Sequence, residues 1–253
     1  MSDPVDLALT AVAVLWGAAT GALLPRAAYR FTVPDEQPWR SHCPEGHLLR
    51  GWLGRTPCGV CVRPPAVESS YTPSIPSAPL LALATALVCA ALAGATGTRP
   101  ELAVWLLLAP VGVLLAAVDF RVRRLPDPLT LPLAGAALAL LGLVALLPEH
   151  AGDWPTALYG ALALGVGYYV LWLINPAGMG FGDVKLALGA GAVLGWYGWP
   201  TVLLGTFAGF LSGALYGGVL VLVRRADRKS AIPFGPFLLA GAFAGLLIGA
   251  YTA

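Results

Sequence analysis

Residues 107–119 read LLAPVGVLLAAVD, an unbroken run of apolar residues that ends at an aspartate. The run belongs to a longer apolar segment, and a helix needs about 20 such residues to span a bilayer. Along the whole chain, hydropathy and turn residues mark eight apolar segments, at 5–24, 79–97, 102–118, 128–147, 155–174, 184–199, 201–223 and 232–251. We therefore predict an all-α, polytopic membrane protein with about eight transmembrane helices.

The composition excludes an ordinary soluble domain. Of the 253 residues, 58% are hydrophobic and 11% are charged, whereas soluble domains carry roughly 25% charged residues. The lipid bilayer is the environment that fits such a chain. The net charge of +2 is too small to indicate a nucleic-acid partner. Small residues pervade the apolar segments, as in residues 186–195, LALGAGAVLG, and they predict close helix packing.

One interruption between the apolar segments is much longer than the others. Residues 25–78 are polar, rich in Pro and Arg, and contain three of the four cysteines. We therefore divide the chain into a first transmembrane helix (1–24), a cysteine-containing loop (25–78) and a seven-helix domain (79–253).

The basic residues are distributed unevenly between the two sides of the predicted bundle. All but one (Arg99) of the 15 Lys and Arg residues fall on the same side as the cysteine-containing loop. Because cytoplasmic loops carry the excess of Lys and Arg, we predict an inner-membrane protein with this loop in the cytoplasm and both termini outside. The acidic start, MSDPVD, lacks the basic region of a cleaved signal and predicts a retained first helix.

Two aspartates, Asp119 and Asp183, lie at the predicted membrane edge. An ionised carboxylate at the bilayer centre costs about 2.5–3.5 kcal/mol on insertion scales, so each needs a reason to be there. Asp119 could pair with the arginines of residues 121–124, and Asp183 could pair with Lys185 or cap a helix. The eight-span topology places both acids at cytoplasmic helix ends, where the bundle could bring them together. Two neighbouring carboxylates share a proton, an arrangement that activates water for peptide hydrolysis.

Glycines surround the second aspartate. Residues 178–183 read GMGFGD, and this glycine density makes a regular helix unfavourable. Unwound backbone at membrane depth is tolerated only where it lines protein or water. We therefore predict that this segment lets the backbone approach an extended substrate.

Three stretches of sequence together resemble a known family. Residues 180–186, GFGDVKL, resemble the GxGD element of intramembrane aspartic peptidases. Residues 119–132, DFRVRRLPDPLTLP, and 232–237, IPFGPF, resemble the other two motifs of the type IV prepilin (leader) peptidases. The three ordered matches fall within residues 110 to 240, and they are more specific than a GxGD element alone.

The resemblance implies roles for particular residues. It makes Asp119 and Asp183 the catalytic pair, with Gly180 and Gly182 as supporting residues of the second motif, and Asp127 as an acid that is structural or faces the substrate. Lys185 either tunes Asp183 electrostatically or is a plain interfacial cation.

The resemblance also implies a reaction. One aspartate acts as general base on a water and the other donates a proton to the scissile carbonyl, without a covalent intermediate and without a cofactor. The implied substrates are prepilin-like or pseudopilin proteins with a short basic leader and an apolar helix. Cleavage would follow a glycine at the cytoplasmic membrane face.

The cysteine-containing loop holds a candidate zinc site. Cys58 and Cys61 form a CxxC pair, and Cys43 and His47 lie upstream, so the four residues could supply a tetrahedral ligand set. The alternatives are a reduced CxxC pair or a loop without metal. The family pattern has two CxxC pairs, but Gly46 stands where the second cysteine of the first pair belongs. Because that cysteine is missing, we do not expect methylation of the new N-terminus from S-adenosylmethionine, the second activity of many members.

Two other classes of function compete with a peptidase. An ion- or proton-coupled transporter could use Asp119 and Asp183 as ion sites, but an inverted repeat with paired broken helices would favour it, and only one Gly-broken element is found. A non-catalytic assembly protein of a pilus or secretion system is the other. The intact acids in intact motifs argue against it.

Overall fold

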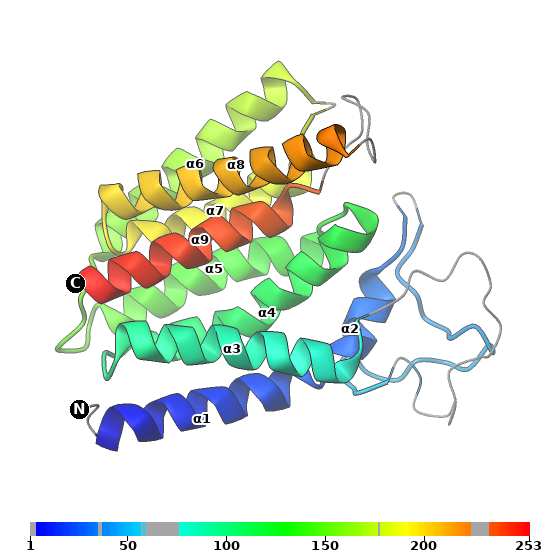
Figure 1. Cartoon of the computed structure of the whole chain (residues 1–253), viewed down its shortest axis with the longest axis horizontal. Helices are drawn as coiled ribbons and strands as arrows, with labels where there is room; N and C mark the ends of the chain where they lie inside the picture. Colours follow the sequence, from blue (N-terminus) through cyan, green and yellow to red (C-terminus); the bar gives the residue numbers. More distant parts are fainter. Residues whose placement is uncertain (1–3, 35–36, 57, 59–75, 177, 224–232) are drawn as a thin grey trace.

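The protein is all-helical in the computed structural model, which describes every residue except 1–3, 35–36, 57, 59–75, 177 and 224–232. The described residues form nine helices (Figure 1): α1 Pro4–Gly21, α2 Leu24–Phe31, α3 Ala78–Thr96, α4 Glu101–Val122, α5 Asp127–Val144, α6 Trp154–Ile174, α7 Phe181–Gly195, α8 Trp199–Leu222 and α9 Gly235–Thr252. Seven of these helices are long and apolar enough to cross a membrane. The prediction of an all-α, polytopic membrane protein is confirmed.

Two helices differ from the sequence prediction. The short helix α2 occupies the start of the segment that we expected to be an irregular polar loop. Pro25 lies in its first turn, where the fixed φ of proline suits a helix start. Hydropathy missed α2 because two arginines interrupt a segment of only eight residues, although the other six residues are buried and the helix packs against α3 and α4.

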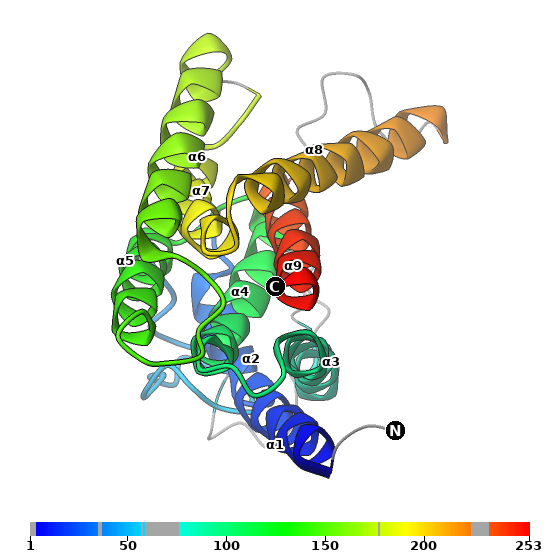
Figure 2. The same ribbon diagram turned by 90° about the vertical axis from the view of Figure 1, so that its left-hand side faces the viewer.

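Helix α7 is shorter than a typical span. Its 15 residues give a length of about 22 Å, whereas the hydrocarbon core of a bilayer is about 30 Å thick. It packs against α5, α6, α8 and α9, which surround it in the bundle (Figure 2). Most of its residues are buried, so it is an interior helix of the bundle.

Glycines let neighbouring helices pack closely, as the small-residue pattern predicts. A Cβ atom at Gly160 of α6 would lie 2.5 Å from the carbonyl oxygen of Gly191 in α7, and one at Gly195 would lie 2.5 Å from the oxygen of Thr156. These backbones are in direct contact, so the seam between α6 and α7 has no room for larger residues.

We expect Gly191→Val to destabilise the bundle by about 3 kcal/mol or more, because its side chain would enter the backbone of α6 at Gly160. Gly167→Val is the matched control, since a Cβ atom added at Gly167 of α6 would have no heavy atom of the described residues within 4 Å. Thermal unfolding of the two purified variants in the same detergent measures the difference. Equal melting temperatures would contradict the packing of this seam.

The start of α1 and the end of α9 lie at one end of the bundle, and α2 lies at the other end (Figure 1). The connections from α4 to α5 and from α6 to α7 share the end at which α2 lies. Large apolar side chains are exposed along the outer helices, and only 17% of the residues of the apolar windows in α1 and α8 are buried. This surface suits lipid, and the protein is a multi-pass membrane protein.

Candidate active site

Asp119 lies in the last turn of α4, and 4% of its surface is exposed. Its Oδ2 atom accepts a hydrogen bond from the backbone N–H of Gly235, the first residue of α9, at 3.0 Å. The helix ends at Arg123, whose left-handed backbone (φ 53°) turns the chain away from α4. The positive end of the α9 dipole therefore faces this carboxylate.

One of the nearby arginines has other partners. Arg124 donates to the backbone oxygens of Pro34 and Gln37, and its guanidinium lies 4.1 Å from the centroid of the Trp39 ring. It joins the start of the cysteine-containing loop to the turn after α4. The hydrogen bond that Asp119 accepts comes instead from the Gly235 amide, which the sequence analysis did not assign.

Asp183 lies in the first turn of α7, and 6% of its surface is exposed. Its Oδ2 atom accepts a hydrogen bond from the N–H of Gly180 at 3.2 Å, and its own N–H donates to the oxygen of Gly180 at 3.0 Å. The carboxylate therefore helps to cap α7, one of the two ordinary roles considered from the sequence.

The second ordinary role, an ion pair with Lys185, is not what the structure shows. Lys185 Nζ lies 2.7 Å from Asp127 Oδ2, so this lysine joins the first turns of α7 and α5. The same ammonium lies 5.0 Å from the centroid of the Phe181 ring. Asp127 is 61% exposed at its side chain, unlike the two buried acids.

Leu125 connects the two halves of the site. A Cβ atom at Gly182 would lie 2.9 Å from Leu125 Cβ, and one at Gly235 would lie 3.3 Å from Leu125 Cδ1 and 2.8 Å from Asp119 Oδ2. The buried leucine thus packs between the residue next to Asp183 and the residue that holds Asp119. The fold therefore brings the two acids together, as the topology argument predicts.

The glycines of the 178–183 segment lie just before and within the first turn of α7. Gly182 is inside α7, where it allows close contact with Leu125, so its close approach is to the protein itself. Gly180 precedes the helix, and a Cβ atom there would meet Asp183 Oδ2 at an ordinary 3.6 Å. The prediction that the whole segment is irregular is wrong, because the helix begins at Phe181, and its first turn is stabilised by Asp183.

Tyr168 of α6 is a site residue that sequence reasoning missed. It is 2% exposed and belongs to the same buried cluster as Leu125, which packs between the two halves of the site, and Val184, the residue after Asp183. Nothing in the local sequence distinguishes it from Tyr169, because only the packing of α6 in the bundle decides which tyrosine is buried in this cluster.

An apolar cavity of about 340 Å³ is lined by residues of α3, α4, α5, α7 and α9. Its lining includes Ala116 and Leu186, each one helical turn from an acid, and Pro236, which follows Gly235. Residues three apart share a helix face, so the cavity extends from the level of the acids into the bundle. At its far end it reaches Trp105.

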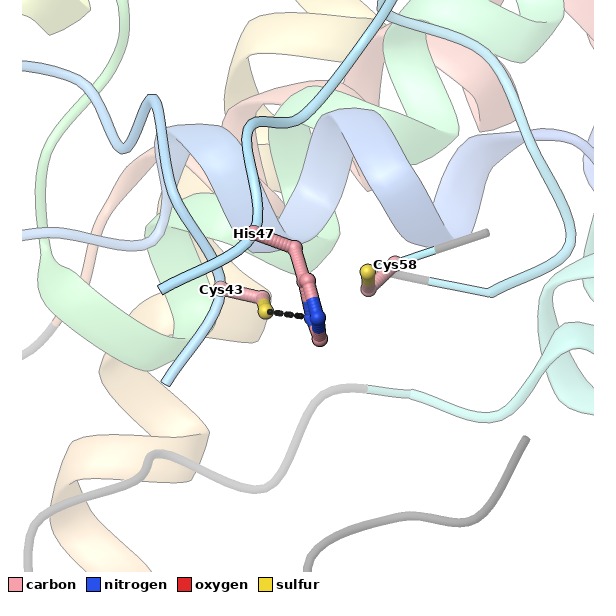
Figure 3. A group of neighbouring side chains, drawn as sticks. All are labelled: Cys43, His47 and Cys58. Carbon is pink, nitrogen blue, oxygen red and sulfur yellow. Dashed lines mark hydrogen bonds between the residues drawn. The ribbon is translucent and has the colours of Figure 1, made fainter. Parts of the chain in front are cut away.

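The cysteine-containing loop brings three candidate metal ligands together (Figure 3). The ligand atoms of Cys43, His47 and Cys58 all lie within 4.8 Å of one another, and Cys43 Sγ is 3.5 Å from His47 Nδ1. Cys61, the fourth predicted ligand, is outside the described residues. Gly46 has a φ of +78° and donates its N–H to the oxygen of Cys43, so the position where the family pattern has a cysteine serves a tight turn here.

Helix α2 anchors this loop to the bundle. Arg26 donates to the oxygen of Arg50 at 2.9 Å, and Arg30 donates to the oxygen of Gly51 at 2.8 Å. The Arg30 guanidinium also lies 3.9 Å from the centroid of the Trp52 ring. The two arginines of α2 therefore hold the loop by backbone hydrogen bonds and a cation–π contact.

Comparison with known proteins agrees with this geometry. Residues 105–218 match the model of the type IV leader peptidase family. A prepilin leader peptidase/N-methyltransferase of Aeromonas hydrophila is 37% identical over 241 residues, which cover 85% of this chain and 75% of the relative. A protein of the same name from Burkholderia pseudomallei (strain 1026b) is 35% identical, and the match covers 88% of this chain and 70% of the relative. Another, from Pseudomonas aeruginosa, is 32% identical, and the match covers 88% of this chain and 75% of the relative. The chain belongs to the type IV leader peptidase family.

Membership of the leader peptidase family favours a protease over an ion-coupled transporter. The segment that matches the family model contains Asp119, Asp127 and Asp183. Gly235, whose amide holds Asp119, lies after the matched segment in the sequence. No solved structure matches this leader peptidase.

Proposed function

We propose that this leader peptidase is an aspartic endopeptidase that removes the leader from type IV prepilin-like or pseudopilin proteins, with Asp119 and Asp183 as its catalytic pair. The observation that carries the proposal is the meeting of two buried carboxylates from distant segments, each held by a backbone N–H at a helix start. Nearby carboxylates do not easily ionise together, so one holds a proton while the other is a base.

The mechanism uses both protonation states of the pair. One carboxylate takes a proton from water as the water oxygen attacks the scissile carbonyl carbon, and the other gives its proton to the carbonyl oxygen. The resulting diol then breaks the C–N bond, and the nitrogen leaves with the proton that the base received. The amides of Gly180 and Gly235 hold one oxygen of each carboxylate in place through these steps.

The cavity beside the acids supports a substrate that is apolar next to the scissile bond. The residues that line this cavity are apolar, so it suits apolar side chains of a substrate. A prepilin-like protein, in which an apolar helix follows the leader, meets this requirement.

The distribution of charge supports a cytoplasmic active site in the inner membrane. The acids lie at the end of the bundle where α2 and the α4–α5 connection lie, and this is the end with the excess of basic residues. Both termini are then outside. In this arrangement the Lys185–Asp127 ion pair lies at the cytoplasmic membrane face and fixes the first turns of α5 and α7.

We also propose a structural zinc ion at Cys43, His47, Cys58 and Cys61. Zinc binds sulfur at about 2.3 Å and nitrogen at about 2.0–2.1 Å, so tetrahedral ligands of these types lie about 3.6 Å apart. The separation of Cys43 Sγ and His47 Nδ1 is 3.5 Å. A zinc ion would join the turn at Gly46 to the segment at Cys58 and stabilise the loop; proteolysis itself needs no cofactor.

We expect the purified wild-type protein to contain zinc. The variants Cys43→Ser and Cys58→Ser should contain no zinc, because three ligands rarely hold structural zinc. Without the metal, the loop should be cleaved faster in limited proteolysis. Cys89→Ala is the control, since Cys89 is buried in α3 and is not a member of the cluster. Elemental analysis measures the metal. Wild-type protein without zinc would refute the site.

The proposed activity is tested by incubating the purified protein in detergent with a prepilin and sequencing the product N-terminus. Removal of the leader at one bond is the expected result, and an intact prepilin would overturn the proposal. The names of the relatives also include N-methyltransferase. Because Gly46 replaces a cysteine of the family pattern, we propose that the product is unmethylated, and an added methyl group in its mass would contradict this.

A further inference from the structure

Tyr168 carries a buried hydroxyl group that the fold does not use. It lies on α6, is 2% exposed, and its hydroxyl has no hydrogen-bond partner among the residues that the structure describes. Buried polar groups in proteins are nearly always hydrogen-bonded, and an unpaired one costs free energy. Phenylalanine would fill the same space without this cost, so the hydroxyl needs another explanation.

The ring of Tyr168 is fixed by aromatic neighbours. Its centroid lies 5.6 Å from that of Phe210, in a stacked arrangement, and 5.9 Å from that of Phe234. Phe234 immediately precedes Gly235, the residue whose amide holds Asp119. The tyrosine therefore packs against the segment that positions the first acid.

Packing also links Tyr168 to the second acid. Tyr168 belongs to the same buried cluster as Leu125 and as Val184, the residue after Asp183 on α7, and α6 and α7 pack along their glycine seam. Tyr168 thus contacts the segment that positions Asp119 and shares a cluster with the first turn of α7, which carries Asp183. A group that can both donate and accept a hydrogen bond at this place is suited to holding a water molecule.

We propose that the Tyr168 hydroxyl holds and orients the attacking water beside Asp183. This inference rests on the proposed peptidase function. The water oxygen forms a bond to the scissile carbonyl carbon, its proton passes to the ionised carboxylate of the pair, and the protonated carboxylate gives its proton to the carbonyl oxygen. When the C–N bond breaks, the nitrogen takes the proton that the base received and the diol returns one to the other carboxylate. Tyr168 neither gains nor loses a proton, so it is a positioning residue.

The test compares Tyr168→Phe with Tyr169→Phe in cleavage of a prepilin by the full chain in detergent. Tyr169 is the next residue on the same helix, is exposed, and stacks on Trp172, so it is a matched control. We expect kcat to fall about 10- to 100-fold for Tyr168→Phe, with KM changed less than about twofold, because the hydroxyl binds water and not substrate. The melting temperature should be unchanged or higher.

Two unnatural residues at the same position separate the hydrogen bond from the shape of the ring. 4-Aminophenylalanine, which keeps a donor, should restore part of kcat, and 4-methylphenylalanine, which has a similar shape without a donor, should not. Equal kcat for the Tyr168→Phe and Tyr169→Phe variants would overturn the inference and leave the proposed function intact. A parallel loss of activity and melting temperature would also overturn it, since that indicates a structural role. If wild-type protein cleaves no prepilin, the proposed function fails and this inference fails with it.

Discussion

Replacing either buried acid, as Asp119→Asn or Asp183→Asn, should lower kcat for leader removal by about 10³-fold or more, since positioned acids and bases contribute about 10²–10⁴-fold. Asparagine keeps the size of the side chain and its oxygen can still accept the hydrogen bond from Gly235 or Gly180. The fold should therefore persist while proton transfer is lost. Initial rates of prepilin cleavage measure the effect, and melting temperatures show that the variants are folded.

Asp127→Asn is the matched control for these two variants. Asp127 is an exposed acid of the same membrane face, paired with Lys185, and an ion pair of this kind contributes about 0.2–1 kcal/mol. We expect its kcat to stay within about tenfold of wild type. If Asp119→Asn or Asp183→Asn cleaved as fast as Asp127→Asn, the assignment of the catalytic pair would be wrong.

The second large effect is expected from a single added methyl group, in Gly235→Ala. The new Cβ would lie 2.8 Å from Asp119 Oδ2 and 3.3 Å from Leu125 Cδ1, so the carboxylate must move away from the amide that holds it. A displacement of about 1 Å at a reacting group can cost about 10²-fold in rate. We expect a loss of kcat of this size, measured by the same cleavage assay.

Gly218→Ala provides the control for this change. Gly218 lies in α8, and an added Cβ there would have no heavy atom within 4 Å in the described part of the chain, so the same substitution should leave cleavage unchanged. Alanine is a better helix former than glycine, so local propensity alone would favour Gly235→Ala. Full activity of Gly235→Ala would therefore falsify the contact between the start of α9 and Asp119.

Hydropathy was sufficient to predict most of the helices, because burial in lipid requires long apolar runs that are visible in one stretch of sequence. Seven of the predicted segments correspond to helices that are long enough to span. The segment at 184–199 corresponds to the short α7, which is apolar because protein surrounds it rather than lipid. Hydropathy does not distinguish these two environments, and it does not detect α2, which has only eight residues, two of them arginines.

The sequence was sufficient to predict the two acids of the candidate site, but not the groups that contact them. Asp119 and Asp183 stand out in the sequence because charged residues are rare near hydrocarbon. Lys185 is two residues from Asp183, and sequence proximity suggested a pair between them. The structure instead pairs Lys185 with Asp127, because residues two apart on a helix point in different directions.

The sequence by itself determined that this chain is a polytopic helical protein with two acids at one membrane face, because hydropathy and charge are properties of local stretches. Only the tertiary structure decided what those acids meet. The amide that holds Asp119 comes from Gly235, 116 residues away, and the packing of α6 on α7 places Tyr168 in the buried cluster that includes Leu125 and Val184. Such contacts depend on how separate helices are oriented against one another, and no single stretch of the sequence contains that information.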